Sequence, residues 1–218
     1  MGRRFVELSH PIHDCLITYP GLPAPVIDEH LTREESREKY APGTEFSIGR
    51  ITMIANTGTY LDTPFHRFAD GVDLSGLSLE QLVDLDGVTV DVTGNDSRAI
   101  GPEVFDGLSL AGCAVLVQTG WDRHWSTAAY GSGHPFLTSA AAEGLVAARP
   151  AIVGIDSLNI DDGADGSRPA HTKLLAANIP IVEHLTNLAE LPSGGFRFTA
   201  APPLVAADHA ARAASDCC

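Results

Sequence analysis

Short runs of apolar residues, separated by turn-forming residues, dominate the hydrophobic pattern of this chain. Continuous runs of this length, bounded by glycine, proline or polar residues, are typical of strands that are buried on both faces. We therefore predict three buried strands, within residues 113–121 (CAVLVQTGW), 151–161 (AIVGIDSLNID) and 179–185 (IPIVEHL). A fourth segment, 88–94 (VTVDVTG), predicts a strand that ends in a turn.

One segment carries clear helical signals. Residues 137–150 (LTSAAAEGLVAARP) begin with a capping residue, Thr138 or Ser139, continue with Ala and Leu, and end at a proline. Weaker helical or turn-like patterns occur at 31–45, 77–87 and 101–108. Strands with two or three helices between them predict one mixed α/β or α+β domain with a sheet core, which spans residues 1–218.

The segment 46–63 (FSIGRITMIANTGTYLDT) is strand-like, and its second half continues as far as the sequence TPFH. In an extended chain, side chains two residues apart lie on the same face. A strand through this region would therefore place six residues on one face: Asn56, Gly58, Tyr60, Asp62, Pro64 and His66. Gly58 would leave that face open, so that a ligand could approach the backbone.

Taken alone, this segment has two interpretations of similar weight. It is either the face of a site that binds ligands and moves protons, or an Asp-Thr-Pro turn in which Asp62 bonds its own backbone. A downstream segment, 168–185 (RPAHTKLLAANIPIVEHL), favours the site, because His171 precedes Glu183 by twelve residues. That gap fits a short helix, a turn and a return strand, which could bring both side chains to Asp62.

Composition narrows the range of partners. The 218 residues include 28 Asp and Glu against 14 Lys and Arg, which gives a formal net charge of −14. Nucleic acids and anionic membranes both attract clustered basic residues, so we exclude both as partners. The sequence shows neither a secretory signal nor an apolar run of membrane-spanning length, and we expect a cytoplasmic protein. The four cysteines lack zinc-site spacing, and the tail at about 206–218, which contains Cys217 and Cys218, is expected to fray.

With these segments in order, the chain resembles the cyclase family of metal-dependent hydrolases, which includes bacterial kynurenine formamidase and isatin hydrolase. The family signature is similar to H-x-G-x-H-x-D-x-P-x-H, followed far downstream by a His and a Glu about twelve residues apart. Other segments that carry the resemblance, from ELSHPIHDCLITYPGLPAP to FRFTAAPPLV, extend it over most of the chain. It implies a swivelling β/β/α fold that assembles into dimers or tetramers.

The resemblance implies roles for the residues that match the signature. The metal ligands of the family correspond to Asp62, His171 and Glu183, and its catalytic histidine corresponds to His66. The turn-forming positions of the signature correspond to Gly58 and Pro64.

Two positions depart from the signature, because Asn56 and Tyr60 stand where the family has metal-ligating histidines. Imidazole suits zinc, whereas an oxygen-rich site favours manganese or magnesium. The implied cofactor is therefore a divalent metal, manganese or zinc, which is bound weakly or is absent.

The leading hypothesis is an enzyme that hydrolyses a small amide, lactam or lactone, similar to an arylformamidase. The metal would polarise the carbonyl and activate water, and His66 would act as general base and then as general acid. Tyr60 would donate a hydrogen bond to the developing oxyanion. Asn56, Gly58 and Phe65 are expected at the substrate. The aromatic residues Phe65, Phe68, Trp121 and Trp125 could build an apolar wall for it, although core packing is the more common use for any one of them.

Two other hypotheses stay open at this point. A metal-free lyase, isomerase or cyclase would move protons with Tyr60, His66 and Glu183. Alternatively, a non-catalytic protein would bind a small molecule on the same scaffold. The acidic loop 161–166 (DDGADG) lacks the spacing of a calcium loop, so we interpret it as a solvated turn, and His184 carries no functional signal.

Overall fold

The computed structural model of this protein describes residues 2 and 4–206. The expected frayed tail, with its two cysteines, lies outside the described residues apart from residue 206. Within these residues the α-helices and strands are β1 (Val26–Leu31), α1 (Arg33–Arg37), β2 (Ile48–Thr52), β3 (Tyr60–Asp62), α2 (Pro64–Arg67), β4 (Leu85–Asp91), β5 (Ala99–Ile100), β6 (Ala114–Gln118), β7 (Phe136–Leu137), α3 (Ser139–Ala148), β8 (Ile152–Ile155), α4 (Pro169–Ala176), β9 (Ile181–Glu183) and β10 (Gly194–Phe198).

A six-stranded mixed sheet forms the centre of the body, in the order β10-β4-β6-β8-β9-β3. The four inner strands are parallel to one another, and each edge strand is antiparallel to its neighbour. The inner strands β6, β8 and β9 are the three predicted buried strands, and their side chains are almost fully buried. Short 3-10 helices at 79–81, 102–105, 121–124, 128–131 and 188–190 complete the connections.

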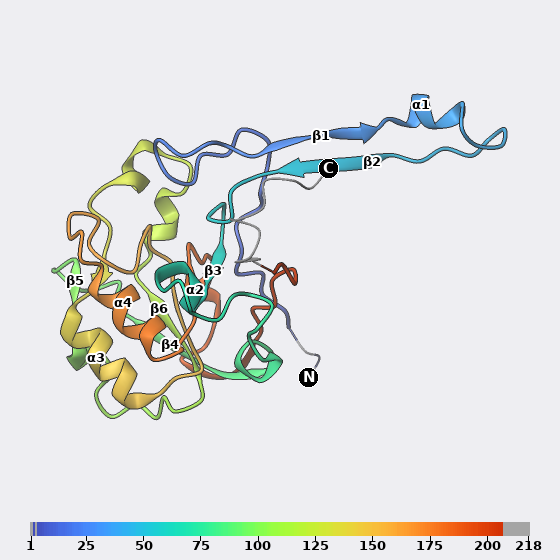
Figure 1. Cartoon of the computed structure of the whole chain (residues 1–218). Coiled ribbons are helices and arrows are strands. Elements are labelled where there is room, and N and C mark those ends of the chain that lie inside the picture. Colours follow the sequence, from blue (N-terminus) through green and yellow to red (C-terminus); the bar gives the residue numbers. More distant parts are fainter. Residues whose placement is uncertain (1, 3, 207–218) are drawn as a thin grey trace.

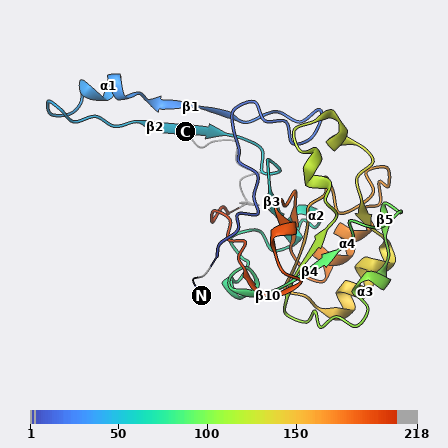
Figure 2. The ribbon, with the colours of Figure 1, turned by 180° about the vertical axis from the view of Figure 1, so that it is seen from behind.

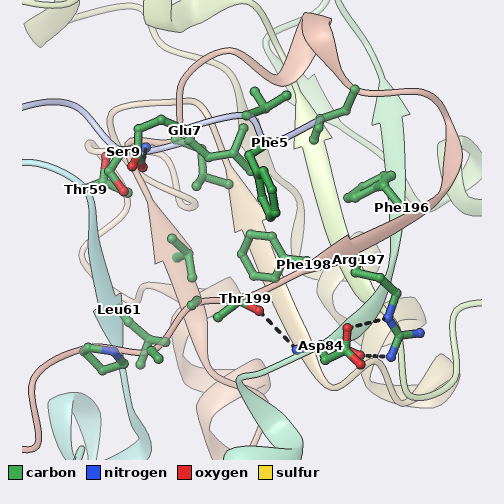
Figure 3. A pocket seen from close by; sticks show the side chains of 18 of the residues that line it. Phe5, Glu7, Ser9, Thr59, Leu61, Asp84, Phe196, Arg197, Phe198 and Thr199 are labelled. Atoms are coloured by element: carbon green, nitrogen blue, oxygen red, sulfur yellow. Dashed lines mark hydrogen bonds and ion pairs between the residues drawn. The ribbon is translucent and has the colours of Figure 1, made fainter. Parts of the chain in front are cut away.

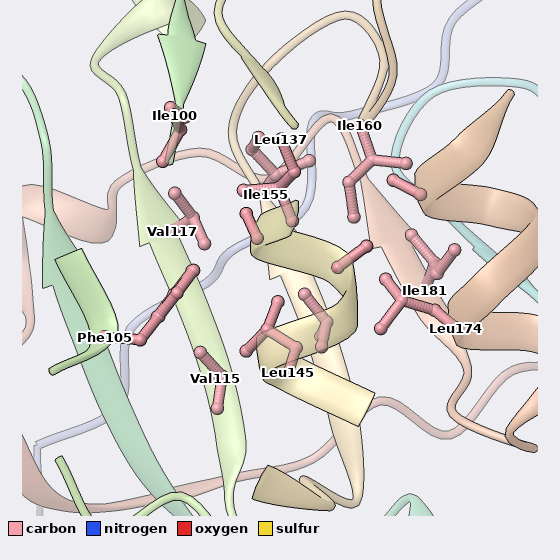
Figure 4. Close-up of a cluster of buried hydrophobic side chains, with 14 of the residues drawn as sticks. Ile100, Phe105, Val115, Val117, Leu137, Leu145, Ile155, Ile160, Leu174 and Ile181 are labelled. Atoms are coloured by element: carbon pink, nitrogen blue, oxygen red, sulfur yellow. The ribbon is translucent and has the colours of Figure 1, made fainter. Parts of the chain in front are cut away.

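The two long helices, α3 and α4, cover one face of this sheet (Figure 1). Their apolar side chains and those of the sheet form one buried cluster, in which Leu145 of α3 and Leu174 of α4 are fully buried (Figure 4). A second cluster on the opposite face packs Leu116, Val182 and Leu185 beneath the N-terminal segment and the short helices. The sheet therefore lies between two apolar layers and holds its strand ends rigidly.

The two-stranded sheet of β1 and β2 projects from this body as an arm, with α1 near its tip (Figures 1 and 2). The capping box at Thr32 and Glu35 explains why α1 begins there. Several large apolar side chains along the arm are exposed: Val26, Ile27, Phe46, Ile48, Ile51 and Met53. Two strands alone bury little apolar surface, so the arm has no core of its own.

The predicted fold class, an α/β domain built on a mixed sheet, is confirmed. The helix expected at 137–150 is α3, and Thr138 caps it by accepting a hydrogen bond from the backbone N–H of Ala141. The expected single strand over 46–63 is wrong, because it divides into β2 and β3 with bends between them. No helix among the described residues is long and apolar enough to cross a membrane.

The core makes a direct prediction. Replacing the fully buried Leu145 with Ala should lower the free energy of unfolding by about 2–5 kcal/mol, because the substitution leaves a cavity between α3 and the sheet. The matched control is Leu79→Ala, since Leu79 is 67% exposed and should change stability by about 0.5 kcal/mol or less. Urea unfolding of the two variants measures both changes. Equal losses of unfolding free energy would contradict the packing of Leu145 between α3 and the sheet.

Candidate active site and metal centre

The strand that the sequence predicted through residues 56–66 is much shorter in the structure. Only Tyr60–Asp62 form β3, and the helix α2 begins directly afterwards at Pro64. Proline suits the first helical position, because its fixed φ is helical and its missing N–H would be unpaired there. The shared face therefore arises from a strand, a bend and a helix together. Asn56 Nδ2 and His66 Nδ1 still lie 3.4 and 3.3 Å from the same oxygen, Asp62 Oδ1.

Gly58 does not provide the open position that we expected. Its backbone has a φ of +66°, its N–H donates to Thr18 Oγ1 at 2.8 Å, and a Cβ there would meet Ile12 Cγ1 at 2.9 Å. The glycine is thus needed for the left-handed turn and for close packing of the N-terminal segment.

The downstream residues reach Asp62 as the sequence predicted. His171 lies in the first turn of α4, the chain turns at 177–178, and Glu183 ends β9. Strand β9 pairs antiparallel with β3, so that Glu183 stands opposite Tyr60. His171 Nε2 lies 3.5 Å from Asp62 Oδ2 and 3.6 Å from Glu183 Oε1, so one imidazole nitrogen faces both carboxylates.

The donor atoms of this cluster fit a divalent metal ion. Asp62 Oδ2 is buried and has no hydrogen-bond partner among the described residues, which is the state expected of a ligand atom. One ligand atom each from Asp62, His66 and His171 lie within 4.8 Å of one another. Carboxylate and imidazole groups are the usual ligands of zinc and manganese in proteins. Of the predicted ligands, Glu183 lies at the edge of this group, because its two oxygens accept hydrogen bonds from Ile160 N–H and from Tyr60.

Asp161 orients His171, a role that the sequence analysis missed. The loop 161–166 was interpreted as a solvated turn, but the first residue of the loop is fully buried. Asp161 Oδ2 lies 2.7 Å from His171 Nδ1 and also accepts the backbone N–H of His171 at 3.0 Å. A proton on Nδ1 leaves Nε2 as the nitrogen that faces the site. Asp161 ends the apolar run 151–161 from which a buried strand was predicted, and this position was the signal that could have revealed it.

Electrostatics keeps the Tyr60 phenol neutral. Burial raises the pKa of Tyr60 well above its usual value, and the charge of Glu183 raises it further. The phenol O–H donates to Glu183 Oε2 at 2.5 Å, so Tyr60 is neither a phenolate ligand nor a donor aimed at a substrate in this structure. Burial also raises the pKa of Glu183, although His171 opposes the shift.

The carboxylates around His171, rather than its burial, decide the direction of its pKa shift. Burial lowers the pKa of His171, but the three carboxylates around the ring outweigh burial and raise it above its usual range. A metal ion that binds here has to displace the proton on Nε2.

A cavity of about 330 Å³ opens onto this cluster. It is lined by the predicted residues Asn56, Tyr60, His66, His171 and Glu183, and by residues that the sequence analysis did not select: Tyr19, Leu22, Arg67, Asn159 and Arg168. Tyr19 joins the polar network because its hydroxyl lies 3.2 Å from the Tyr60 hydroxyl and accepts from Asn159 at 3.1 Å.

The aromatic wall that we expected is not part of this cavity. Among the described residues that line the cavity, none is Phe65, Phe68, Trp121 or Trp125. Trp125 instead stacks on His10, with ring centroids 4.0 Å apart, and its edge meets the fully buried His184. His184, which gave no signal in the sequence, is thus the centre of an aromatic cluster, where Tyr130 bonds its Nδ1 at 2.7 Å.

A larger cavity of about 810 Å³ lies between the N-terminal segment and β10. Phe5, Phe196 and Phe198 line it, and Asp84 is paired with Arg197 at its edge (Figure 3). Of the predicted site residues, it contains Tyr60 alone. Although this cavity is larger, the carboxylate and imidazole groups that could bind a metal or move protons lie at the cavity of about 330 Å³.

Comparison with known proteins agrees with this geometry. Residues 6–162 match the model of the Cyclase family. A kynurenine formamidase of Bacillus cytotoxicus is 28% identical over 199 residues, which cover 91% of this chain and 89% of that protein. The kynurenine formamidase of Bacillus cereus (strain ATCC 14579) is 26% identical with the same coverage.

Solved structures show the same fold. Isatin hydrolase A from Labrenzia aggregata, bound to benzyl benzoate, superposes with a TM-score of 0.78 at 23% identity, covering 93% of this chain and 88% of that chain. A structure described as a potential metal-dependent hydrolase with cyclase activity gives a TM-score of 0.72 at 26% identity, with coverages of 93% and 91%.

This chain belongs to the Cyclase family, because the family model matches well over half of its length. The family membership that the residues suggested is confirmed. The relatives named kynurenine formamidase agree with the predicted class of enzyme, a hydrolase acting on carbon–nitrogen bonds other than peptide bonds. The roles of the individual site residues stay predictions.

The buried His184 makes a prediction about pH. Burial lowers the pKa of His184 to about 3, whereas the same imidazole in the unfolded chain has a pKa of about 6.5. Between these values the unfolded state binds a proton that the folded state does not, so stability falls as the pH drops below about 6.5. His184→Gln should reduce this loss by up to about 1.4 kcal/mol per pH unit. Urea unfolding between about pH 7 and pH 4.5 measures both slopes, and parallel slopes would exclude His184 as the cause.

Proposed function

We propose that this protein hydrolyses a small amide, lactam or lactone, with a divalent metal held by Asp62, His171 and Glu183. One observation carries the proposal: His171 Nε2 faces Asp62 Oδ2 at 3.5 Å and Glu183 Oε1 at 3.6 Å. A cation in place of the Nε2 proton would have all three groups as neighbours. Such a metal polarises a carbonyl and lowers the pKa of bound water.

The protein's own residues supply the acid–base chemistry. Asp62 divides its two oxygens, because Oδ2 faces His171 whereas Oδ1 lies 3.3 Å from His66 Nδ1. That contact orients the His66 ring and leaves its other nitrogen for the reacting groups. The side chain of His66 is 44% exposed, so its proton can exchange with solvent between turnovers. We assign His66 as the general base and then the general acid.

Two further site residues contact the carboxylates and help to position them. Tyr60 holds Glu183 through the 2.5 Å hydrogen bond, and Asn56 Nδ2 lies 3.4 Å from Asp62 Oδ1 at the cavity wall. Because Asn56 and Tyr60 replace two imidazoles of the family signature, the donor set is richer in oxygen. We therefore favour manganese over zinc as the ion.

The relatives support the choice of bond. The kynurenine formamidases and the isatin hydrolases are named for an amide and a lactam substrate, and both share most of their length with this chain. We propose the same broad class of bond here, in a small-molecule substrate that fits a cavity of about 330 Å³. A cytoplasmic location stays a prediction.

A second candidate is a metal-independent proton transfer by a lyase, isomerase or cyclase. It is favoured by the short contact between Tyr60 and Glu183, which places a phenol and a carboxyl group of raised pKa side by side in the cavity. Metal content of the native protein, together with the response of turnover to chelators, separates the two candidates.

The variant His66→Ala tests the leading proposal. It should lower turnover of an arylformamide by about 10²–10⁴-fold, because the positioned acid–base is lost, while the bound metal per chain stays unchanged. Asp62→Asn is the matched variant that should lose the metal as well. Elemental analysis and steady-state kinetics on both variants give the answer. Loss of metal in His66→Ala would show that His66 is a metal ligand together with Asp62 and His171. Near wild-type turnover in this variant would refute the proposed role of His66 as general base and general acid.

We also propose that the protein is a homo-oligomer, a dimer or a tetramer, in which the arm packs on a second copy. The arm has no core of its own, and Ile51 and Phe46 are 64% and 51% exposed. Apolar side chains gathered on a projecting two-stranded sheet are typical of a surface that another chain covers.

The variant Ile51→Asp tests this assembly. Transfer of an unpaired carboxylate from water into an apolar interface is strongly unfavourable. The variant should therefore dissociate at concentrations where the wild type is still assembled. Sedimentation velocity over about a hundredfold range of concentration measures the change. The control is Leu79→Ala on the body. A wild-type protein that stays monomeric at every concentration would refute the proposal.

A further inference from the structure

Two arginines line the cavity of the candidate active site, Arg67 and Arg168. Each is close in sequence to a site histidine: Arg67 follows His66 in α2, and Arg168 precedes His171 by three residues at the start of α4. Helix α2 and the start of helix α4 therefore bring two guanidinium groups to one cavity, beside the buried carboxylates.

The hydrogen bonds of both arginines go to neutral partners, although the charge of Arg168 also helps to lower the pKa of the nearby Asp165 carboxyl. Arg67 Nε donates to Thr172 Oγ1 at 3.2 Å, which links α2 to α4. Arg168 Nη1 donates to Asn159 Oδ1 at 3.3 Å and to the carbonyl oxygen of Asp162 at 3.2 Å. Each guanidinium has five N–H donors, so these bonds leave several donors on each group.

Neither arginine forms an ion pair with a carboxylate among residues 4–206. Other arginines of the chain do form such pairs, for example Arg50 with Asp28 and Arg197 with Asp84. Arg67 is exposed and Arg168 is half-buried, so both keep guanidinium donors at the cavity wall that a ligand can reach. Planar guanidinium groups are well suited to bind a carboxylate of a ligand through paired hydrogen bonds.

The charge of the rest of the protein makes these two groups important. The net charge of −14 and the site carboxylates Asp62 and Glu183 would repel an anionic ligand. A substrate carboxylate that enters this cavity is therefore stabilised where local cations compensate for that repulsion, and the proposed metal ion would be one of them. Arg67 and Arg168 are the two arginines in its lining.

We propose that Arg67 and Arg168 bind a carboxylate of the substrate, so that the enzyme selects amides, lactams or lactones that carry a carboxylate group away from the scissile bond. The inference rests on the proposed hydrolase function for the identity of that bond. The binding of the carboxylate itself does not depend on turnover, and this separates the two claims.

The binding experiment uses 2-aminobenzoate and its neutral counterpart aniline as probes, measured by calorimetry on the full-length protein. The wild type should bind the carboxylate probe at least about tenfold more tightly than aniline. Arg67→Gln should reduce binding of 2-aminobenzoate by about 10–100-fold, as expected for the loss of hydrogen bonds to a charged group, and should leave aniline unchanged. Arg149→Gln is the matched control, because Arg149 is exposed at the end of α3, away from the cavity.

Arg168 needs a milder substitution, because it also anchors the loop that follows Asp161. Arg168→Lys keeps the charge but loses the planar fork, so a smaller loss of 2-aminobenzoate binding is expected, with an unchanged thermal midpoint. A lowered midpoint together with unchanged binding would show that Arg168 has a structural role only, and would overturn its part of the proposal.

The kinetic experiment compares 2-formamidobenzoate with formanilide, which lacks the carboxylate. Arg67→Gln should raise KM for 2-formamidobenzoate by about 10–100-fold with kcat retained, and should change the constants for formanilide far less. Equal effects on the two substrates, or equal binding of the two probes to the wild type, would overturn the inference. Binding of 2-aminobenzoate that depends on Arg67, without hydrolysis of either formamide by the wild type, would uphold the carboxylate site and reject the proposed hydrolase function.

Discussion

Three residue pairs join β3 to β9, and the candidate site depends on this short antiparallel contact. It places Tyr60 opposite Glu183, and the pleat then puts Asp62 on the same face two residues further along. Helix α4 ends shortly before β9, so the pairing also sets the position of His171. One strand contact therefore brings together groups from three parts of the chain, and a shift of one residue in its register would turn Tyr60 and Asp62 away from the cavity.

The cost of burying these polar groups explains much of the surrounding structure. Asp62, His171 and Glu183 are each almost fully buried, and buried charges are stable only when they are paired or ligate a metal. Asp161 pairs with one side of His171, whereas the backbone N–H of Ile160 and the Tyr60 hydroxyl satisfy Glu183. The buried oxygen Asp62 Oδ2 makes no hydrogen bond among the described residues and faces only His171 Nε2 at 3.5 Å, at the point where a cation would complete the arrangement.

The body and the arm obey different constraints. The body buries its sheet between two apolar layers, which gives the site a rigid support. The arm is a two-stranded sheet with apolar side chains in solvent, which is a poor state for an isolated chain. An oligomer would relieve this exposure without changing the site, whereas the arginines at the cavity wall concern the selection of substrate and act inside one chain.

Local pattern was a good guide wherever one element decided its own structure. The apolar runs predicted β6, β8 and β9, and the capping residue Thr138 with the following alanines predicted α3. The pattern failed at residues 46–66, because alternation of side chains does not reveal where a chain bends. Pro64 was the local signal that the strand had to end, and it was read as part of the strand face.

By itself, the sequence determined the family, the buried strands and six of the residues that meet at the site: Asn56, Tyr60, Asp62, His66, His171 and Glu183. Only the tertiary structure decided how they are used. It buried Asp161 beside His171 and placed the Tyr60 hydroxyl so that it donates a hydrogen bond to Glu183. It also packed Gly58 against the N-terminal segment and brought Arg67 and Arg168 to one cavity. The physical reason is that burial, hydrogen-bond partners and local charge depend on residues distant in sequence, which no local pattern contains.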